Sequence, residues 1–263
     1  MIFFQRTPIK PMNKKMVDFP IPDLDFDEEI TLSFDTELPY SPPLSIKNNV
    51  IQLIESFGFN LQSKTPFKST SNSMVFCSGI PYSYDIFALK MSSNRQRIIA
   101  EYENSIKIKE SPYLVKYCDL FDADISVIIQ MELCVYGDIA CKKMDEANLW
   151  KLIHDVGSAL DVIHNSGFIH LDVSPSNILM TDDNYFKLGD FGTLCEIGQF
   201  DTGMEGAGPY VSPEALLYPG NEYEKVYVTE KTDIFSFGLV LLEAATGFYA
   251  PRGGSTNYSR IRN

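Results

Sequence analysis

Two polar motifs joined by a pair of apolar runs constrain the fold of this chain more than any other feature. The first motif is His170-Leu171-Asp172-Val173-Ser174-Pro175-Ser176-Asn177, and the second, a short way downstream, is Asp190-Phe191-Gly192. The apolar runs Ile178–Met180 and Tyr185–Leu188 flank the polar segment Thr181–Asn184, which predicts two strands connected by a turn. One alternative is an ordinary hairpin that happens to begin in a polar loop.

The side chains of the two motifs suit the transfer of a phosphoryl group. Asp172 could orient a hydroxyl group and accept its proton, and this chemistry leaves the protein little other covalent work. Asn177 and Asp190 offer hard oxygen ligands of the kind that Mg²⁺ prefers when it also binds phosphate oxygens and water. The motifs therefore predict a magnesium-dependent phosphoryl-transfer site.

Composition limits the class of protein and its partners. With 263 residues, of which 44% are hydrophobic, the chain can build a sizeable core and two lobes. Its net charge of −13 argues against nucleic acid or an anionic membrane as a partner, since both bind positive surfaces. Five scattered cysteines without a CxxC pair, and the lack of a signal peptide or membrane-spanning run, predict an intracellular protein of the cytoplasm or nucleus.

The chain is expected to contain three regions. Residues 1–48 are rich in proline and include the acidic run Asp23–Glu29, which predicts a mostly disordered tail or docking segment. Thr7-Pro8 and Ser41-Pro42 are either proline-directed phosphorylation sites or dipeptides of the kind common in such tails. Residues 49–134 are expected to form a strand-rich lobe, and residues 135–263 a helical one.

Hydrophobic patterning predicts the elements of the two lobes. Strands are expected over residues 49–54, 73–77, 85–91, 114–119 and 126–131, with a helix over 95–109. In the second lobe, Asn148–His164 carries apolar residues at the spacing of one helix face and is followed by Gly167. A further apolar helix is expected over residues 233–246.

The two polar motifs resemble the catalytic loop and the metal-binding motif of eukaryotic protein kinases. This resemblance covers residues from about 50 to 249 and implies an α+β, bilobal protein-kinase-like fold. It further implies ATP and Mg²⁺ as cofactors, a protein hydroxyl as the acceptor, and Asp172 as the catalytic base. Because the printed chain stops soon after the helix expected at residues 233–246, the last helices of the large lobe are expected to be absent.

The resemblance assigns further residues to the nucleotide site. Phe87-Ala88-Leu89-Lys90 stands where kinases carry a strand lysine that holds the α and β phosphates. Its glutamate partner is Glu101 or Glu103, and alignment from Val115 favours Glu101. The expected hinge runs from Glu132 to Cys134, and Met131, just before it, is the expected gatekeeper. The residues expected to contact the nucleotide are Val75, Ala88, Lys90, Glu132 and Cys134.

Three features depart from the kinase pattern. Lys68, Thr70 and Ser73 occupy the positions of the three glycines that let backbone amides approach the phosphates. Ser174 replaces a lysine that neutralises the transferring group, which predicts a slow enzyme, although Lys68 could reach toward the phosphates instead. Leu171 replaces an arginine that pairs with a phosphorylated activation loop, so activation by loop phosphorylation is not expected.

Short segments further resemble the Wee/Myt inhibitory kinases. These segments are His170–Val173, Lys187–Gly192 and Glu205–Tyr210, the last of which precedes Ser212-Pro213-Glu214. The third segment has Ala207 and Pro209 where that family has aspartate and arginine. The resemblance implies phosphorylation of a cyclin-dependent kinase in cell-cycle control, with Asp233 bracing the catalytic loop. A pseudokinase scaffold and a serine/threonine kinase outside this branch are the alternatives.

Overall fold

The computed structural model of the protein describes residues 44–70, 73–80, 82, 85–92, 94–123, 126–198, 208–216 and 228–248. The chain divides into two units, Met1–Leu38 and Pro39–Asn263, and every described residue belongs to the second. Several predictions concern segments that lie outside the described residues. These segments are the tail up to residue 43, with its Thr7-Pro8 and Ser41-Pro42 dipeptides, residues 205–207, and residues 249–263.

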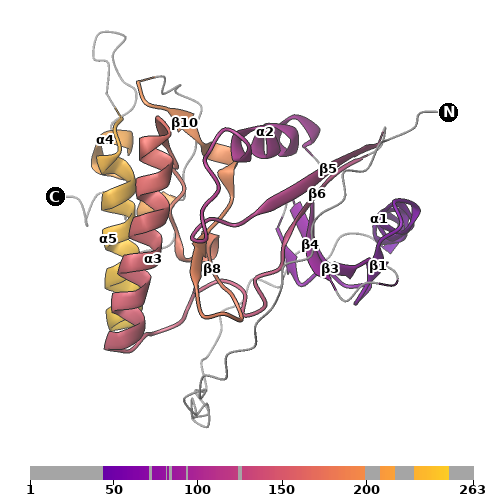
Figure 1. Ribbon diagram of the computed structural model, residues 1–263, viewed down its shortest axis with the longest axis horizontal. Coiled ribbons are helices and arrows are strands. Elements are labelled where there is room, and N and C mark those ends of the chain that lie inside the picture. Colours follow the sequence, from indigo (N-terminus) through magenta and orange to yellow (C-terminus); the bar gives the residue numbers. More distant parts are fainter. Residues whose placement is uncertain are drawn as a thin grey trace. The chain divides into compact units, whose positions relative to one another are not determined.

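A six-stranded antiparallel sheet forms the first half of the described fold (Figure 1). The strand order is β1-β3-β4-β6-β5, and β2 also pairs with β3. The strands are β1 (Asn60–Leu61), β2 (Lys68–Ser69), β3 (Ser73–Gly79), β4 (Ile86–Ser92), β5 (Tyr117–Ala123) and β6 (Ser126–Glu132). The register places Val75 opposite Lys90 and Ala88 opposite Met131, which gathers four of the expected nucleotide-site residues on adjacent strands.

The strand predicted over residues 49–54 is wrong, because this segment belongs to helix α1 (Leu44–Ser56). Val50, Ile54 and Phe57 follow one another at helical intervals and pack against the same apolar cluster of the sheet. A short run of apolar residues fits a buried strand and a helix face equally well, so periodicity alone could not separate them. The packing against the sheet decided in favour of the helix.

Helix α2 (Arg95–Ser105) covers part of the sheet and begins where the sequence predicted. Asn94 caps its first turn, since the side-chain oxygen accepts a hydrogen bond from the Arg97 N–H at 3.0 Å. Ile98 is buried against Val127 and Ile129 of β6. The helix ends at Ser105 and not at residue 109 as expected, and it presents Glu101 toward the sheet.

Two long helices, α3 (Glu146–Asn165) and α5 (Lys231–Thr246), lie side by side in the second half (Figure 1). The short elements around them are β7 (Phe168–Ile169), β8 (Ile178–Met180), β9 (Phe186–Leu188), β10 (Cys195–Glu196), α4 (Pro213–Leu216) and three 3₁₀ helices, η1 (Pro175–Asn177), η2 (Phe191–Thr193) and η3 (Gly208–Tyr210). The α+β architecture, strand-rich and then helical, is confirmed. Within the described part of the chain, no helix combines the length and apolarity needed to cross a bilayer.

The predicted hairpin between the two polar motifs is held against α3. Strands β8 and β9 pair antiparallel, with Leu179 opposite Lys187. The buried carboxylate of Asp155 on α3 accepts a hydrogen bond from the Phe186 N–H at 3.0 Å and lies 2.9 Å from the Lys151 ammonium. A buried carboxylate is tolerated when it is paired in this way. The hairpin therefore has a fixed position relative to the helical core, and its far end leads directly into the second polar motif.

The close approach between Gly189 and Val115 gives a test of this packing. A Cβ at position 189 would lie 2.7 Å from Val115 Cγ2, whereas a Cβ at Gly157 in α3 would meet nothing within 4 Å. We expect Gly189→Ala to lower the free energy of unfolding by about 1–3 kcal/mol, because a stiff, buried valine must move. Gly157→Ala should be neutral or stabilising by up to about 1 kcal/mol. Urea denaturation of both variants tests this, and equal effects would contradict it.

Candidate functional site

A cavity of about 570 Å³ lies where the sheet meets the hairpin and the loops of the second half. Its apolar lining includes Val75, Ala88, Val115, Met131 and Leu179. Its polar lining includes Lys68, Lys90, Asn177 and Asp190. An apolar slot with a few convergent polar groups is the usual form of a small-molecule site. Val75, Ala88, Glu132 and Cys134, the expected nucleotide contacts besides Lys90, all line it.

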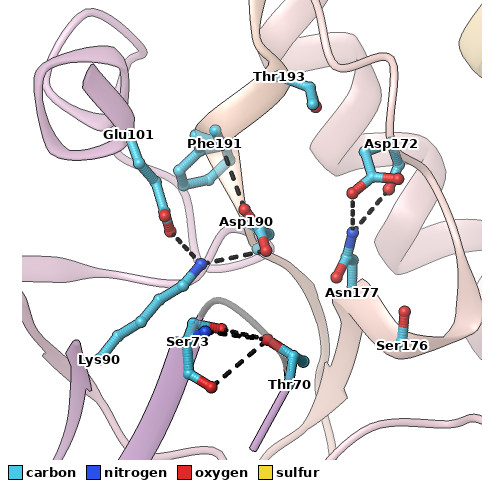
Figure 2. Close-up of polar contacts among 12 residues, drawn as sticks. Thr70, Ser73, Lys90, Glu101, Asp172, Ser176, Asn177, Asp190, Phe191 and Thr193 are labelled. Carbon is cyan, nitrogen blue, oxygen red and sulfur yellow. Dashed lines mark hydrogen bonds and ion pairs between the residues drawn. The ribbon is translucent and has the colours of Figure 1, made fainter. Parts of the chain in front are cut away.

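Lys90 connects two carboxylates from different parts of the chain. Its ammonium lies 2.7 Å from Glu101 Oε1 on α2 and 3.1 Å from Asp190 Oδ2 after β9 (Figure 2). Tyr117 donates a hydrogen bond from its hydroxyl to Glu101 Oε1 at 2.6 Å, a contact that the sequence did not suggest. Glu103, the alternative partner, is exposed. The structure thus places Glu101 beside Lys90.

The charges of this cluster follow from burial and proximity. Burial alone would raise the pKa of Asp190, but the neighbouring Lys90 ammonium outweighs it and holds that pKa below its ordinary value. Burial would likewise lower the pKa of Lys90, yet the carboxylates of Asp190 and Glu101 raise it. For Glu101, burial and the charge of Asp190 raise the pKa against the opposing effect of Lys90. Asp190 is therefore ionised at neutral pH.

Asp172 and Asn177 are held together within the catalytic loop. The Asn177 side-chain amide donates through Nδ2 to the Asp172 backbone oxygen at 2.9 Å and to Asp172 Oδ2 at 2.8 Å. Figure 2 shows the amide oxygen of Asn177 pointing away from Asp172. Because Nδ2 is committed to Asp172, this oxygen is the atom that Asn177 offers to a ligand.

The catalytic loop depends on Asp233 at the start of α5. The wholly buried carboxylate accepts hydrogen bonds from the backbone N–H groups of His170, at 2.8 Å, and Leu171, at 2.9 Å. His164 Nε2 lies 2.8 Å from the same carboxylate. Leu171 has a φ of 65°, a left-handed conformation that is unfavourable for a branched side chain. The placement agrees with the bracing role expected for Asp233.

His170 joins the two polar motifs through its imidazole ring. Nδ1 accepts a hydrogen bond from the Asp172 N–H at 3.2 Å, so the ring proton must reside on Nε2. Nε2 then donates to the backbone oxygen of Gly189, at 3.2 Å. The His170 ring therefore connects the residue before Asp190 to the loop that carries Asp172.

The oxygen atoms available to a metal ion fit Mg²⁺. Asn177 supplies an amide oxygen and Asp190 a carboxylate, and both residues line the cavity. Among the described residues, no group of three or more His, Cys, Asp or Glu side chains could hold a metal ion. Two hard oxygen donors suit an ion that takes its remaining ligands from phosphate groups and water.

Hydroxyl groups make contacts at two of the positions where the kinase pattern has glycine. Ser73 donates from its backbone N–H to Thr70 Oγ1 at 3.0 Å, and the two hydroxyl oxygens lie 2.9 Å apart (Figure 2). The Thr70 N–H also donates to the Ser73 backbone oxygen at 2.8 Å. Thr70 and Ser73 are thus held to each other by side-chain and backbone contacts.

The other two departures are explained by local contacts. Ser174 is buried, and its hydroxyl lies 3.0 Å from that of Ser176. Leu171 is buried in an apolar cluster with Ile169, Cys195 and Val228. Leu171 therefore makes apolar contacts at the position where kinases carry an arginine, and the expectation about loop phosphorylation stays a prediction.

The hinge is anchored by contacts that sequence reasoning missed. Lys187 of β9 lies 2.7 Å from Glu132 Oε2, and Glu132 Oε1 accepts a hydrogen bond from the Lys116 N–H at 2.6 Å. Burial raises the pKa of the Cys134 thiol to about 12, so this cysteine is protonated at neutral pH. Lys187 and Glu132 are far apart in sequence and carried no pattern that would pair them.

Part of the segment before α4 packs against α5. Tyr210, the last residue of the expected Wee-type motif, donates from its hydroxyl to Glu243 Oε2 at 2.7 Å. Its backbone oxygen accepts a hydrogen bond from the Ser236 hydroxyl at 2.8 Å. Glu214 accepts a hydrogen bond from the Thr232 hydroxyl at 3.1 Å.

Comparison with known proteins agrees with this geometry. The family model described as "Protein kinase domain" matches residues 83–262. This range contains the strand lysine Lys90, both polar motifs and Asp233. The match covers more than half of the chain.

The relatives include two kinases named as mitosis inhibitors and a third named as a cdc2-inhibitory kinase. "Mitosis inhibitor protein kinase mik1" of Schizosaccharomyces pombe is 29% identical over 180 residues, which are 65% of this chain and 30% of that protein. "Mitosis inhibitor protein kinase wee1" of the same organism is 26% identical over 284 residues, or 98% of this chain and 30% of that protein. "Membrane-associated tyrosine- and threonine-specific cdc2-inhibitory kinase wee-1.3" of Caenorhabditis elegans is 30% identical over 201 residues, or 72% and 28%. The chain spans less than a third of each of these relatives.

The ion pair of Lys90 predicts how Asp190 titrates. In Lys90→Met, we expect the pKa of Asp190 to rise, because the ammonium that lowers it is removed while the burial that raises it remains. In the unaltered chain this pair stabilises the fold above the unfolded-state pKa of 3.8, and the contribution is lost as the pH falls through the lower folded-state pKa.

Carboxyl NMR titration of Asp190 in both proteins measures this shift. Lys187→Met is the matched control, because the Lys187 ammonium contacts Glu132 and not Asp190. The control should leave the titration of Asp190 unchanged. An Asp190 that titrates at the same pH with and without Lys90 would contradict the prediction.

Proposed function

Because the chain belongs to the protein kinase family, on its Wee branch, we propose that it transfers the γ-phosphoryl group of ATP to a hydroxyl group of a protein. The observation that carries this proposal is the meeting of Lys90, Asn177 and Asp190 on the wall of one cavity, with Asp172 bonded to Asn177. These groups come from both halves of the described fold. Their residue types match the parts that phosphoryl transfer needs.

Each of these residues has a role in the proposed reaction. Asp172 orients the acceptor hydroxyl and takes its proton, and its Oδ2 is held in place by the Asn177 amide. Lys90, fixed by Glu101, neutralises the nucleotide phosphates. Asn177 and Asp190 would hold Mg²⁺, which when bound offsets the negative charge of the phosphate oxygens. The protein thus acts mainly by positioning and by electrostatic stabilisation.

The proposed adenine site is the apolar end of the cavity. Val75 and Ala88 lie on adjacent strands of the roof, and the hinge residues Glu132 and Cys134 line the edge. Adenine is flat and apolar on both faces, so it suits a slot between aliphatic side chains, with backbone groups of the hinge available at its rim.

The finer proposal is that the substrate is a cyclin-dependent kinase and that the reaction inhibits it during the cell cycle. It is supported by the relatives, one of which is named as a cdc2-inhibitory kinase specific for tyrosine and threonine. The His170–Val173 and Lys187–Gly192 segments of the same branch support it from the sequence. Such a reaction would occur inside the cell, in the cytoplasm or nucleus.

A scaffold that binds partners without phosphoryl transfer is the second candidate. Two observations favour it. Lys68, Thr70 and Ser73 occupy the three positions where kinases carry glycine, and Ser174 replaces the usual lysine of the catalytic loop. Both changes remove groups through which kinases usually contact the phosphates. A serine/threonine kinase outside the Wee branch is the third candidate, and its substrate would differ.

Replacement of the proposed base tests the reaction. Asp172→Asn should reduce transfer from Mg²⁺-ATP to a cyclin-dependent kinase by on the order of 10²–10⁴-fold, because the amide cannot accept the hydroxyl proton. Radiolabelled phosphate transfer measures the rate, and phosphotyrosine detection identifies the acceptor. Asp161→Asn, on an exposed part of α3, is the matched control and should retain full activity.

The possible outcomes separate the three candidates. Transfer that survives Asp172→Asn would sink the proposed mechanism. Absence of both transfer and Mg²⁺-ATP binding in the unaltered chain would favour the scaffold. Transfer to serine of general protein substrates, with the cyclin-dependent kinase unmodified, would favour the third candidate.

A further inference from the structure

The side chain of Lys68 extends across the cavity, from the sheet that forms its roof to Asp138 and Ser176 at its floor. The residue belongs to β2, at the first of the positions where glycine was expected. Its ammonium lies 2.9 Å from Asp138 Oδ2 and donates to the Ser176 backbone oxygen at 2.8 Å. Asp138 follows the hinge, and Ser176 immediately precedes Asn177 in the catalytic loop. Lys68 therefore places a positive charge on the part of the loop that carries a proposed metal ligand.

This is also the part of the loop where a positive charge is missing. Ser174, which stands in place of a lysine, forms a hydrogen bond between its hydroxyl and that of Ser176. The Lys68 ammonium is held by the backbone oxygen of that same Ser176. The ammonium of Lys68, on β2, thus reaches Ser176, which also contacts Ser174, the residue that replaces the usual loop lysine.

The other cationic side chains of the cavity lining have different partners. They are Lys90 and Lys142. Lys90 is held between Glu101 and Asp190. Lys142 donates to the backbone oxygen of Tyr136, next to the hinge. Of these three lysines, Lys68 is the one whose ammonium donates a hydrogen bond to the catalytic loop.

We propose that Lys68 binds the phosphate groups of the nucleotide and supplies from the glycine-free roof the positive charge that Ser174 cannot supply from the loop. This inference rests on the proposed kinase function and assigns it a binding residue. The Lys68 side chain is 37% exposed and has flexible torsions, so the ammonium can leave Asp138 for a polyphosphate of greater charge. Asp138 holds the ammonium at the floor until a nucleotide enters.

Nucleotide binding by calorimetry tests the assignment. In the full chain, Lys68→Met should raise the Kd for Mg²⁺-ATP by about tenfold or more, the loss expected for one charged hydrogen bond. The Kd for adenosine should change by less than about threefold, because adenosine carries no phosphate. Lys68→Arg should stay closer to the unaltered chain, since the charge is retained. Lys143→Met, an exposed lysine outside the cavity lining, is the matched control for loss of charge.

A second arm tests whether Lys68 and position 174 share one role. Adding Ser174→Lys to Lys68→Met should restore most of the lost affinity for Mg²⁺-ATP, because it returns a cation to the same segment of the loop. Thermal unfolding of each variant establishes that it is folded. Equal loss of ATP and adenosine binding would indicate a structural role and overturn the proposal.

The results also separate this proposal from that of the kinase reaction. Unchanged Mg²⁺-ATP affinity in Lys68→Met would overturn the assignment of Lys68 alone. Mg²⁺-ATP binding that depends on Lys68, in a chain that shows no phosphoryl transfer, would support the assignment and contradict the kinase reaction. Failure of the unaltered chain to bind Mg²⁺-ATP would overturn both.

Discussion

The buried carboxylate of Asp233 holds the loop on which the candidate site depends. It accepts hydrogen bonds from two consecutive backbone N–H groups, those of His170 and Leu171. The second of these residues has a left-handed backbone, which a branched side chain adopts only when its surroundings compensate. A buried charge is in turn tolerated because donors surround it. With the turn fixed in this way, Asp172 and Asn177 follow at defined positions, and α5 becomes part of the site without lining the cavity.

A second coupling joins the two halves of the described fold. The Lys90 ammonium lies between a carboxylate of α2 and one that follows β9, so the sheet, helix α2 and the second polar motif meet at one side chain. The hydroxyl of Tyr117 adds a second contact to Glu101. Movement of α2 away from the sheet would separate Glu101 from both Lys90 and Tyr117, and would leave Asp190 as the remaining carboxylate partner of Lys90. The position of α2 is therefore linked to the electrostatics of the cavity.

The departures from the usual kinase pattern are compensated by side chains. The hydroxyl groups of Thr70 and Ser73, at two of the positions where glycine was expected, contact each other. Leu171 fills an apolar cluster where an arginine would have required an anionic partner. Lys68 brings a cation across the cavity toward the loop of Ser174. The sequence disclosed each replacement, but the contacts that compensate for it became visible only once distant segments were placed together.

Local patterns in the chain were enough to predict the order of the polar motifs, the hairpin between them and the residue types at the site. They favoured Glu101 over Glu103 as the partner of Lys90 without excluding Glu103, and they misassigned residues 49–54, since a short apolar run fits a strand or a helix. Packing placed Glu101 beside Lys90, formed a helix over residues 49–54 and paired Lys68 with Asp138. Burial and ion pairing depend on which surfaces meet, and residues distant in sequence carry no local pattern for that.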